Sequence, residues 1–267
     1  MAKDLTNPAR IPVRQSVDDL LASRFGQFGN WFFRDAEDRS SVIVMFNGRN
    51  VHRTFEAGGK IFNRWTWAER FRHPTFILND PNANSSTGLR LAWYIGTRGE
   101  WSFESIWDEL DAMVDKVAPG AKRITLGSSG GGFAAVKSLL LGRASRAFAI
   151  NPQTDIRLSE EYGCADVFRH YSNGSDLQDD DLPVVSLLHT LEDRKSTGGE
   201  LIYMQNLSDS RHYNRHMLPF IKGLAKMPEK APTVSIRLHH DPDLKHGAPD
   251  LDGTAALLGE CFKGLLL

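Results

Sequence analysis

The chain has few cysteines and no long apolar run. Its 267 residues include only two cysteines, Cys164 and Cys261, which are too few for a disulfide framework and lack the spacing of a metal-binding motif. No stretch approaches the roughly 18 consecutive apolar residues that a membrane span requires. The first fifteen residues also lack the apolar segment of a secretory signal. We therefore expect a cytoplasmic protein without a membrane span.

An excess of charge of one sign is also absent. Lysine and arginine total 32 against 33 aspartates and glutamates, so the formal net charge is −1. Binding to the phosphate backbone of nucleic acids needs a surplus of positive charge, so we expect no nucleic-acid partner. The apolar fraction of 41% and the charged fraction of 24% are ordinary for a globular protein. Since no linker-like stretch or repeat interrupts it, we expect residues 1–267 to form a single domain.

What the sequence does contain is a regular alternation of strands and helices from residue 41 onward. The predicted strands are 41–46, 75–79, 123–126, 146–150, 200–205 and 233–238. The predicted helices are 102–117 with Ser102 as N-cap, 131–141, 159–171, 182–191, 211–227 and a last helix capped by Asp252. This order predicts an α/β fold with a mostly parallel central sheet and helices on both faces.

Three segments fit this alternation less clearly. Residues 1–40 carry many aromatic side chains, including Trp31, Phe32 and Phe33, and predict antiparallel strands or a packed arm. Residues 91–95 are compatible with a short strand or a short helix. Residues 155–195 lie between two predicted strands and are interpreted as a cap or lid insertion.

The chemistry is concentrated where the strand 123–126 leads into the helix 131–141. The connection contains Gly-x-Ser-x-Gly, with Ser129 at its centre. A strand that feeds directly into a helix forces the central residue into a strained turn, and small neighbours are needed because larger side chains would clash. Such a nucleophile elbow exposes the serine hydroxyl at a helix N-terminus, with the amide of Gly130 ready to stabilise an oxyanion. The elbow is typical of the α/β-hydrolase fold. A phosphate-binding loop is disfavoured, since the Gly-Lys-Ser/Thr ending is absent.

A serine nucleophile needs a base and an acid that orients the base. In this fold the chain order is serine, then acid, then histidine. Asp209 follows the strand 200–205, and His246 lies in the loop after the strand 233–238, so we predict Ser129, Asp209 and His246 as the catalytic triad. The competing candidates are His239 and His240 for the base and Asp155 and Asp193 for the acid. A metal site built from His239, His240, Asp241, Asp243 and His246 is disfavoured, and we expect no metal.

The second oxyanion donor is expected from the loop after the strand 41–46. Asn47 and Gly48 lie in this loop, and they are predicted to hold the oxyanion together with Gly130. Arg49, the next residue, is a candidate for binding substrate.

These segments resemble those of the α/β-hydrolase-type bacterial capsular polysaccharide O-acetyltransferases. Residues 126–132 read Leu-Gly-Ser-Ser-Gly-Gly-Gly and are similar to that family's Leu-Gly-Ser-Ser-x-Gly-Gly elbow. Residues 150–153 are similar to its Ile-Asn-Ala-Pro-Gln, one residue shorter, and Asp209-Ser210-x-His212 resembles its acid-bearing segment. The resemblance covers about residues 120–260 and is patchy. We expect Asn151, Gln153 and His212, which lie in these segments, to bind substrate.

The resemblance implies an acetyl-CoA donor, no permanently bound cofactor, and a sugar hydroxyl as acceptor. The leading hypothesis is therefore a serine enzyme that forms an acyl-Ser129 intermediate and moves an acyl group to or from a carbohydrate. A simple carboxylesterase or thioesterase is the alternative within the same chemistry. A non-catalytic α/β-hydrolase-like binding module is the alternative from another class, and a homodimer is left open.

Overall fold

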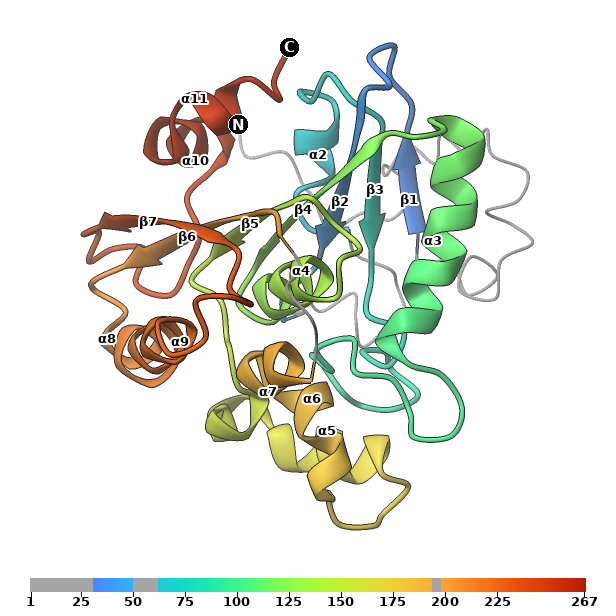
Figure 1. Ribbon diagram of the computed structural model, residues 1–267, viewed down its shortest axis with the longest axis vertical. Coiled ribbons are helices and arrows are strands. Elements are labelled where there is room, and N and C mark those ends of the chain that lie inside the picture. The colour runs from blue at the N-terminus through green and yellow to red at the C-terminus, as the bar shows by residue number, and fades with distance from the viewer. Residues whose placement is uncertain (1–30, 50–61, 194–197) are drawn as a thin grey trace.

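A computed structural model describes residues 31–49, 62–193 and 198–267 of the chain. Its centre is a seven-stranded sheet with the order β1-β3-β2-β4-β5-β6-β7 (Figure 1). The strands are β1 (Trp31–Arg34), β2 (Ser41–Phe46), β3 (Thr75–Leu78), β4 (Lys122–Ser128), β5 (Arg146–Ile150), β6 (Glu200–Asn206) and β7 (Thr233–His239). Only the pair β1 and β3 is antiparallel, and all other neighbours are parallel.

Helices cover both faces of this sheet, as the alternation of strands and helices predicted. The α-helices are α2 (Trp65–Ala68), α3 (Phe103–Val117), α4 (Gly130–Leu140), α5 (Cys164–Tyr171), α6 (Leu182–Val185), α7 (Leu187–Glu192), α8 (Ser210–His212), α9 (Leu218–Leu224), α10 (Leu251–Leu258) and α11 (Glu260–Lys263). The short helices α5 to α7 stand between β5 and β6 in the chain, at one end of the molecule (Figure 1). They lie within residues 155–195, the region that we interpreted from the sequence as a cap or lid insertion.

The fully buried strand β2 shows how the sheet separates two apolar cores. Val42, Val44 and Phe46 point to the face covered by α3 and α4, whereas Ile43 and Met45 point to the face that also packs against α2, α10 and α11. Alternate side chains of a strand point to opposite faces, so a strand covered on both faces needs a continuous apolar run. The sequence of β2, SVIVMF, meets that need.

Several predicted element boundaries were wrong, for local reasons. The predicted helix 211–227 is divided into α8, a π-helical turn at Tyr213–Met217, and α9. Pro219 stands in the first turn of α9, where its missing N–H is tolerated. The predicted helix 159–171 is α-helical only over α5, and the predicted helix 182–191 breaks at Ser186, whose backbone is extended.

Two further expectations need correction. Residues 91–95 form neither strand nor helix, because Trp93 and Tyr94 have positive φ angles of 52° and 60°. The last helical region begins at α10, whose N-cap is Asp250 rather than Asp252; the Asp250 carboxylate accepts a hydrogen bond from the Gly253 amide. Ser102 caps α3 as predicted, accepting from the Ser105 amide. Residues 1–30 of the predicted N-terminal arm lie outside the described residues, while Trp31–Arg34 forms β1.

None of the helices in the described part of the chain has both the length and the apolar character that crossing a bilayer would need.

Helix α4 lies so close to the sheet that only glycine fits at its first turn. A Cβ at Gly131 would lie 2.2 Å from the backbone oxygen of Phe46, and a Cβ at Gly127 would lie 2.1 Å from the backbone oxygen of Gly131. Real Cβ atoms do not approach backbone this closely, and neither neighbour is a flexible side chain that could move aside. The glycines therefore set the distance between α4 and the strands β2 and β4.

We expect Gly131→Ala to lower the free energy of unfolding by more than about 3 kcal/mol, because the new methyl group would push α4 away from β2. Urea unfolding measures the change. Gly142→Ala is the matched control: Gly142 has φ of +71° and nothing within 4 Å of its added Cβ, so only backbone strain of about 1 kcal/mol applies. Equal losses in the two variants would contradict the packing argument.

Candidate active site

Ser129 occupies the turn between β4 and α4 in a strained backbone conformation. Its φ of 55° and ψ of −123° lie in a region that residues other than glycine seldom adopt. The backbone around it is tied down, because the Ser129 amide donates to Ile150 O at 3.0 Å while its carbonyl accepts from Phe133 and Gln153. The side chain is 9% exposed, and its Oγ has no hydrogen-bond partner. The structure thus forms the strained turn between strand and helix that the glycine pattern predicted, which is the geometry of a nucleophile elbow.

The loop after β2 packs against this elbow. A Cβ on Gly48 would lie 2.9 Å from Ser128 O and 3.7 Å from Ser129 Cβ, so Gly48 is a close backbone neighbour of the serine. The adjacent Asn47 differs from the expectation. Its amide donates to Leu78 O at 3.3 Å, and its side chain donates to Asn79 and accepts from the Asn63 amide. Because these donors are already engaged, Asn47 holds the loop in place and Gly48 is the better oxyanion candidate.

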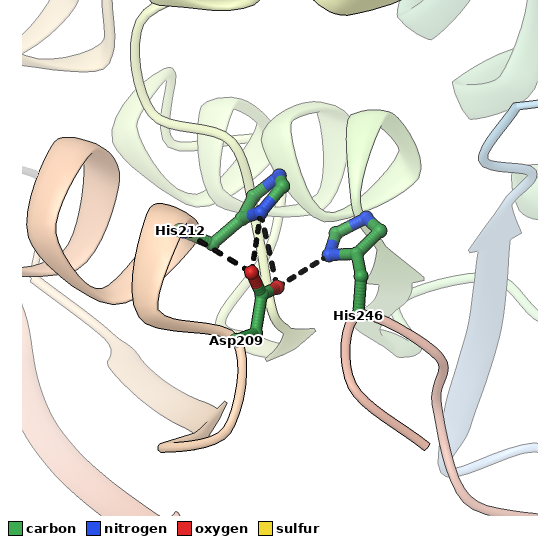
Figure 2. Close-up of side chains that lie close together, drawn as sticks. All are labelled: Asp209, His212 and His246. Atoms are coloured by element: carbon green, nitrogen blue, oxygen red, sulfur yellow. Dashed lines mark hydrogen bonds and ion pairs between the residues drawn. The ribbon is translucent and has the colours of Figure 1, made fainter. Parts of the chain in front are cut away.

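Asp209 and His246 meet at the carboxyl end of the sheet (Figure 2). Asp209 is the N-cap of α8, directly after β6, and His246 comes from the loop between β7 and α10. His246 Nδ1 donates to Asp209 Oδ2 at 2.7 Å. His239 and His240 make no such contact, and His240 Nδ1 instead lies 3.2 Å from Ser208 Oγ. Of the three histidines considered for the base, only His246 is hydrogen-bonded to Asp209.

A second histidine shares the same carboxylate. His212 Nδ1 lies 3.0 Å from Asp209 Oδ1, and the His212 ring stacks on the His246 ring with centroids 3.8 Å apart and planes 19° from parallel. Burial would raise the pKa of Asp209, but the hydrogen bonds and charge interactions with the two histidines outweigh it and hold that pKa well below its ordinary value. The pair of imidazoles thus keeps Asp209 ionised.

Although its Nδ1 donates to Asp209, His212 is itself buried, with 2% exposure. Burial lowers its pKa and outweighs the raising effect of Asp209. A neutral His212 with its proton on Nδ1 leaves Nε2 without a partner, and Nε2 of His246 is also buried and unpartnered. The structure therefore places His212 against the acid rather than at an open surface, whereas the sequence suggested a role in contacting substrate.

The three residues Asp209, His212 and His246 are the grouping in the described chain whose ligand-type atoms, all within 4.8 Å of one another, could hold a metal ion. The cluster that the sequence offered, and that we disfavoured as a metal site, consisted of His239, His240, Asp241, Asp243 and His246, and shares only His246 with this grouping. Both Nδ1 atoms point at the carboxylate at hydrogen-bond distances. This arrangement suits an acid–base group, in which the carboxylate orients imidazoles for proton transfer.

Asn151 holds the loop that carries His246. Its side-chain amide donates to the carbonyls of His246 and Gly247 at 3.2 and 3.1 Å, and its oxygen accepts from the Asn206 amide at 2.8 Å. Asn206 in turn donates to the carbonyls of Asp241 and Lys245. Both asparagines are fully buried. Asn151 is therefore engaged in positioning the loop rather than open to substrate, and Asn206, at the end of β6, is a residue that sequence reasoning missed.

Gln153 and Arg49 lie in different environments. Gln153 is fully buried, and its Oε1 accepts from Trp93 Nε1 at 2.6 Å. Arg49 is exposed, with its guanidinium 5.8 Å from the centre of the Tyr162 ring. The Tyr162 ring lies 6.0 Å from both His212 and His246. Of the residues predicted to bind substrate, Arg49 is thus the exposed one, and it contacts Tyr162, a neighbour of both imidazoles that the sequence did not single out.

The seven-stranded sheet, the covering helices and the strained elbow define an α/β-hydrolase fold. Solved structures that are similar to this chain support the same fold. The chain superposes on the capsule O-acetyltransferase of Neisseria meningitidis serogroup A with a TM-score of 0.59 and 15% identity, covering 88% of this chain and 89% of that one. Esterase B from Lactobacillus rhamnosis gives a TM-score of 0.56 and 12% identity, covering 88% and 80%.

An acylaminoacyl peptidase of Pyrococcus horikoshii is also similar, with a TM-score of 0.55 and 16% identity over 88% of this chain and 37% of that one. No family model matches the chain, and no curated protein matches its sequence. At these identities the comparisons establish the fold, while the chemistry must be argued from the site itself.

A third histidine, His216, lies beside His212, with the two ring centroids 5.1 Å apart. Burial, with a smaller contribution from the charge of His212, lowers the pKa of His216 from 6.5 to about 3. Geometry agrees, because the Thr154 amide donates to His216 Nδ1 at 3.2 Å and so requires that nitrogen to be unprotonated.

We therefore expect His216 to make the protein less stable in mild acid. Below pH 6.5 the unfolded chain binds a proton on His216 that the folded protein does not, so the free energy of unfolding falls as the pH falls. Between pH 7 and pH 5 this group contributes a loss of about 2 kcal/mol. Urea unfolding of the wild type and His216→Gln at both pH values measures it. The variant should lose less stability over this interval, and an unchanged pH dependence would contradict the assignment.

Proposed function

We propose that the chain is a serine-dependent acyl-transfer enzyme that works through an acyl-Ser129 intermediate. Two observations carry the proposal: the strained serine at a helix N-terminus, and the hydrogen-bonded pair Asp209 and His246, which follows β6 and β7 at the same edge of the parallel sheet. Ser129 Oγ and His246 Nε2, the two atoms between which a proton would move, are both buried without a partner. Buried polar atoms of this kind are uncommon unless function requires them.

In the first half-reaction, Ser129 Oγ attacks the carbonyl carbon of an ester or thioester while its proton moves to His246 Nε2. Asp209 holds the His246 ring by its Nδ1 proton and stabilises the imidazolium that forms. The amides of Gly130 and Gly48 would donate to the oxyanion. The bond from the carbonyl carbon to the leaving oxygen or sulfur then breaks, and His246 returns the proton to the leaving group.

In the second half-reaction, an acceptor hydroxyl gives its proton to His246 and its oxygen attacks the acyl carbon. Ser129 leaves and recovers the proton. Water as acceptor gives an esterase or thioesterase, whereas a sugar hydroxyl gives an O-acyltransferase. The outcome depends on which acceptor the site positions and how well it excludes water.

For the donor and acceptor we propose acetyl-CoA and a carbohydrate hydroxyl. The support is the resemblance of the elbow and acid segments to the capsule O-acetyltransferases, together with the structural similarity to one of them. Another structure of that enzyme is a complex with CoA. A carboxylesterase or thioesterase acting on a small substrate is the second candidate, supported by the similarity to esterase B.

Within this site we assign His212 to orienting Asp209. Its Nδ1 gives the carboxylate a second hydrogen-bond partner beside His246, and its ring limits rotation of the His246 imidazole by stacking on it. Because burial lowers its pKa, His212 stays neutral while His246 gains the proton, so the stacked pair avoids two adjacent positive charges.

Ser129→Ala is expected to reduce turnover of a chromogenic acetyl ester, and of acetyl-CoA in the presence of glycans, by at least about 10³-fold, because no other group can form the acyl intermediate. A fluorophosphonate should label the wild type but not the variant. Ser145→Ala, an exposed serine at the other end of the strands, is the control and should behave as wild type. Wild-type protein without Ser129-dependent turnover or labelling would favour the binding-module alternative.

His246→Asn should lower kcat by at least about 10³-fold, while His240→Asn should change it by less than about 3-fold, because only His246 is held by Asp209. Steady-state kinetics on the same chromogenic ester makes the comparison. The reverse order of effects would assign the base to His240 and would be inconsistent with the hydrogen bonding around Asp209.

A further inference from the structure

The ring of Tyr162 packs beside both imidazoles of the candidate active site. Its centroid lies 6.0 Å from that of His212 and 6.0 Å from that of His246, with interplanar angles of 58° and 42°. Aromatic rings at such separations are in contact range. The acid–base group does not need this third ring for its own alignment, because Asp209 already accepts a hydrogen bond from each imidazole.

Tyr162 is tied to the element that carries the acid. It ends the 3₁₀ turn Glu160–Tyr162, in the segment between β5 and β6. The neighbouring Glu161 forms an ion pair with Arg211 of α8, with 2.7 Å between Oε2 and Nη2. Asp209 is the N-cap of that same helix. The ion pair therefore fixes the turn of Tyr162 relative to the helix that begins at Asp209.

A second contact reaches Tyr162 from the loop after β2. The guanidinium carbon of Arg49 lies 5.8 Å from the centre of the Tyr162 ring, within the range of a cation–π interaction. In the sheet, β4 lies between β2 and β5, and the three strands are parallel, so their carboxyl ends lie at one edge. A contact between the loop after β2 and the segment after β5 thus spans the strand end that leads to Ser129.

Tyr162 presents an uncharged and largely apolar ring to the imidazoles. It is half-buried and packs against the apolar core to which α4 and the helices α5 to α7 contribute. Burial, with smaller contributions from the charges of Glu161 and Asp209, raises the pKa of its hydroxyl, which is therefore neutral at neutral pH. Nε2 of His212 and Nε2 of His246 are buried without a hydrogen-bond partner. Packing thus keeps water from both nitrogens, and the Tyr162 ring is a neighbour against which both imidazoles pack.

Shielding from water matters most in the second half-reaction. Either a hydroxyl acceptor or water can attack the acyl-Ser129 intermediate. In both cases the attacking oxygen forms a bond to the acyl carbon, the bond from that carbon to Ser129 Oγ breaks, and the proton of the attacking group passes through His246 Nε2 to Ser129 Oγ. Since His246 activates any hydroxyl that reaches it, an intermediate that is to be transferred survives only if water is excluded.

We propose that Tyr162 is a positioning residue whose ring keeps water from His246 and so protects the acyl-Ser129 intermediate from hydrolysis. Arg49 holds the ring from the side of the loop after β2, and the ion pair of the preceding residue holds it from the side of α8. The inference rests on the proposed acyl transfer and concerns how the same site separates transfer from hydrolysis. Neither Tyr162 nor Arg49 takes part in bond making.

The test measures acylation and attack by water separately. With 4-nitrophenyl acetate and no added acceptor, stopped-flow absorbance gives acylation from the burst and water attack from the steady state, while intact-protein mass spectrometry follows the acetyl group on the chain. Tyr162→Ala should accelerate water attack at least about 5-fold and change acylation less than about 3-fold. Tyr162→Phe keeps the ring and should stay within about 2-fold of the wild type in both. Damage to the fold would instead slow both steps.

Two further variants test whether the effect belongs to this ring and this contact. Phe168→Ala truncates another partly buried ring that packs against the same core. Phe168 makes no ring contact with either imidazole in the part of the chain that the structure describes, so this variant should leave water attack unchanged. Arg49→Gln should accelerate water attack about 2-fold in the wild type and add nothing in Tyr162→Ala, because both changes remove one contact.

Three results would overturn the inference. One is water attack that is unchanged or slower in Tyr162→Ala. Another is an equal acceleration in Phe168→Ala. The third is a wild type in which the acetyl group never accumulates because water attack already outruns acylation.

A chemical probe separates this inference from the proposed function. In the Ser129→Ala background, diethyl pyrocarbonate modifies imidazole nitrogens that solvent reaches, and peptide mass spectrometry reports the rate at His246. If the wild type shows no Ser129-dependent turnover, the proposed function fails. The shielding role still stands if Tyr162→Ala speeds the modification of His246 at least about 5-fold while Phe168→Ala does not, and it falls if the two variants behave alike.

Discussion

The close approach of α4 to the sheet is the constraint on which the site depends. Ser129 must turn the chain from β4 into α4 within one residue, and this is feasible only because Gly127 and Gly131 leave room for backbone to touch backbone. The backbone of Ser129 is held in this conformation because its amide donates to the end of β5 and its carbonyl accepts from α4 and from the segment after β5. A serine placed in this way lies at the positive end of a helix and at the carboxyl edge of a parallel sheet.

A second layer of buried polar contacts brings the distant parts of the site together. Asn151 follows β5, Asn206 ends β6, and the loop of His246 follows β7, so one asparagine pair ties three strand ends into a single unit. The carboxylate of Asp209 then accepts hydrogen bonds from two imidazoles, those of His212 and His246. Because these contacts hold both the His246 loop and the Nδ1 side of its imidazole, the orientation of the ring is fixed by protein atoms alone, as the preorganisation of an acid–base group requires.

Much of this arrangement could be inferred from the order of residues. The alternating strands and helices predicted the parallel sheet, and the glycine pattern located the elbow, because both signals are local and periodic. The pairing of Asp209 with His246 followed from their positions after successive strands. By contrast, the helix 211–227 was predicted as continuous, since neither the π-helical turn at Tyr213–Met217 nor the restart at Pro219 has a clear sequence signature.

Residue types and their order alone determined that the chain carries a strained serine between a strand and a helix, and which strand ends carry Asp209 and His246. Only the tertiary structure decided what the neighbouring polar residues do. Asn47, Asn151 and His212 all look like ligand-binding groups in the sequence, yet in the fold each is engaged with protein atoms. Tyr162, which the sequence did not single out, lies beside both imidazoles and in contact with Arg49. The physical reason is that a polar side chain's role depends on which donors and acceptors the fold brings within 3 Å of it, and residues distant in sequence supply them.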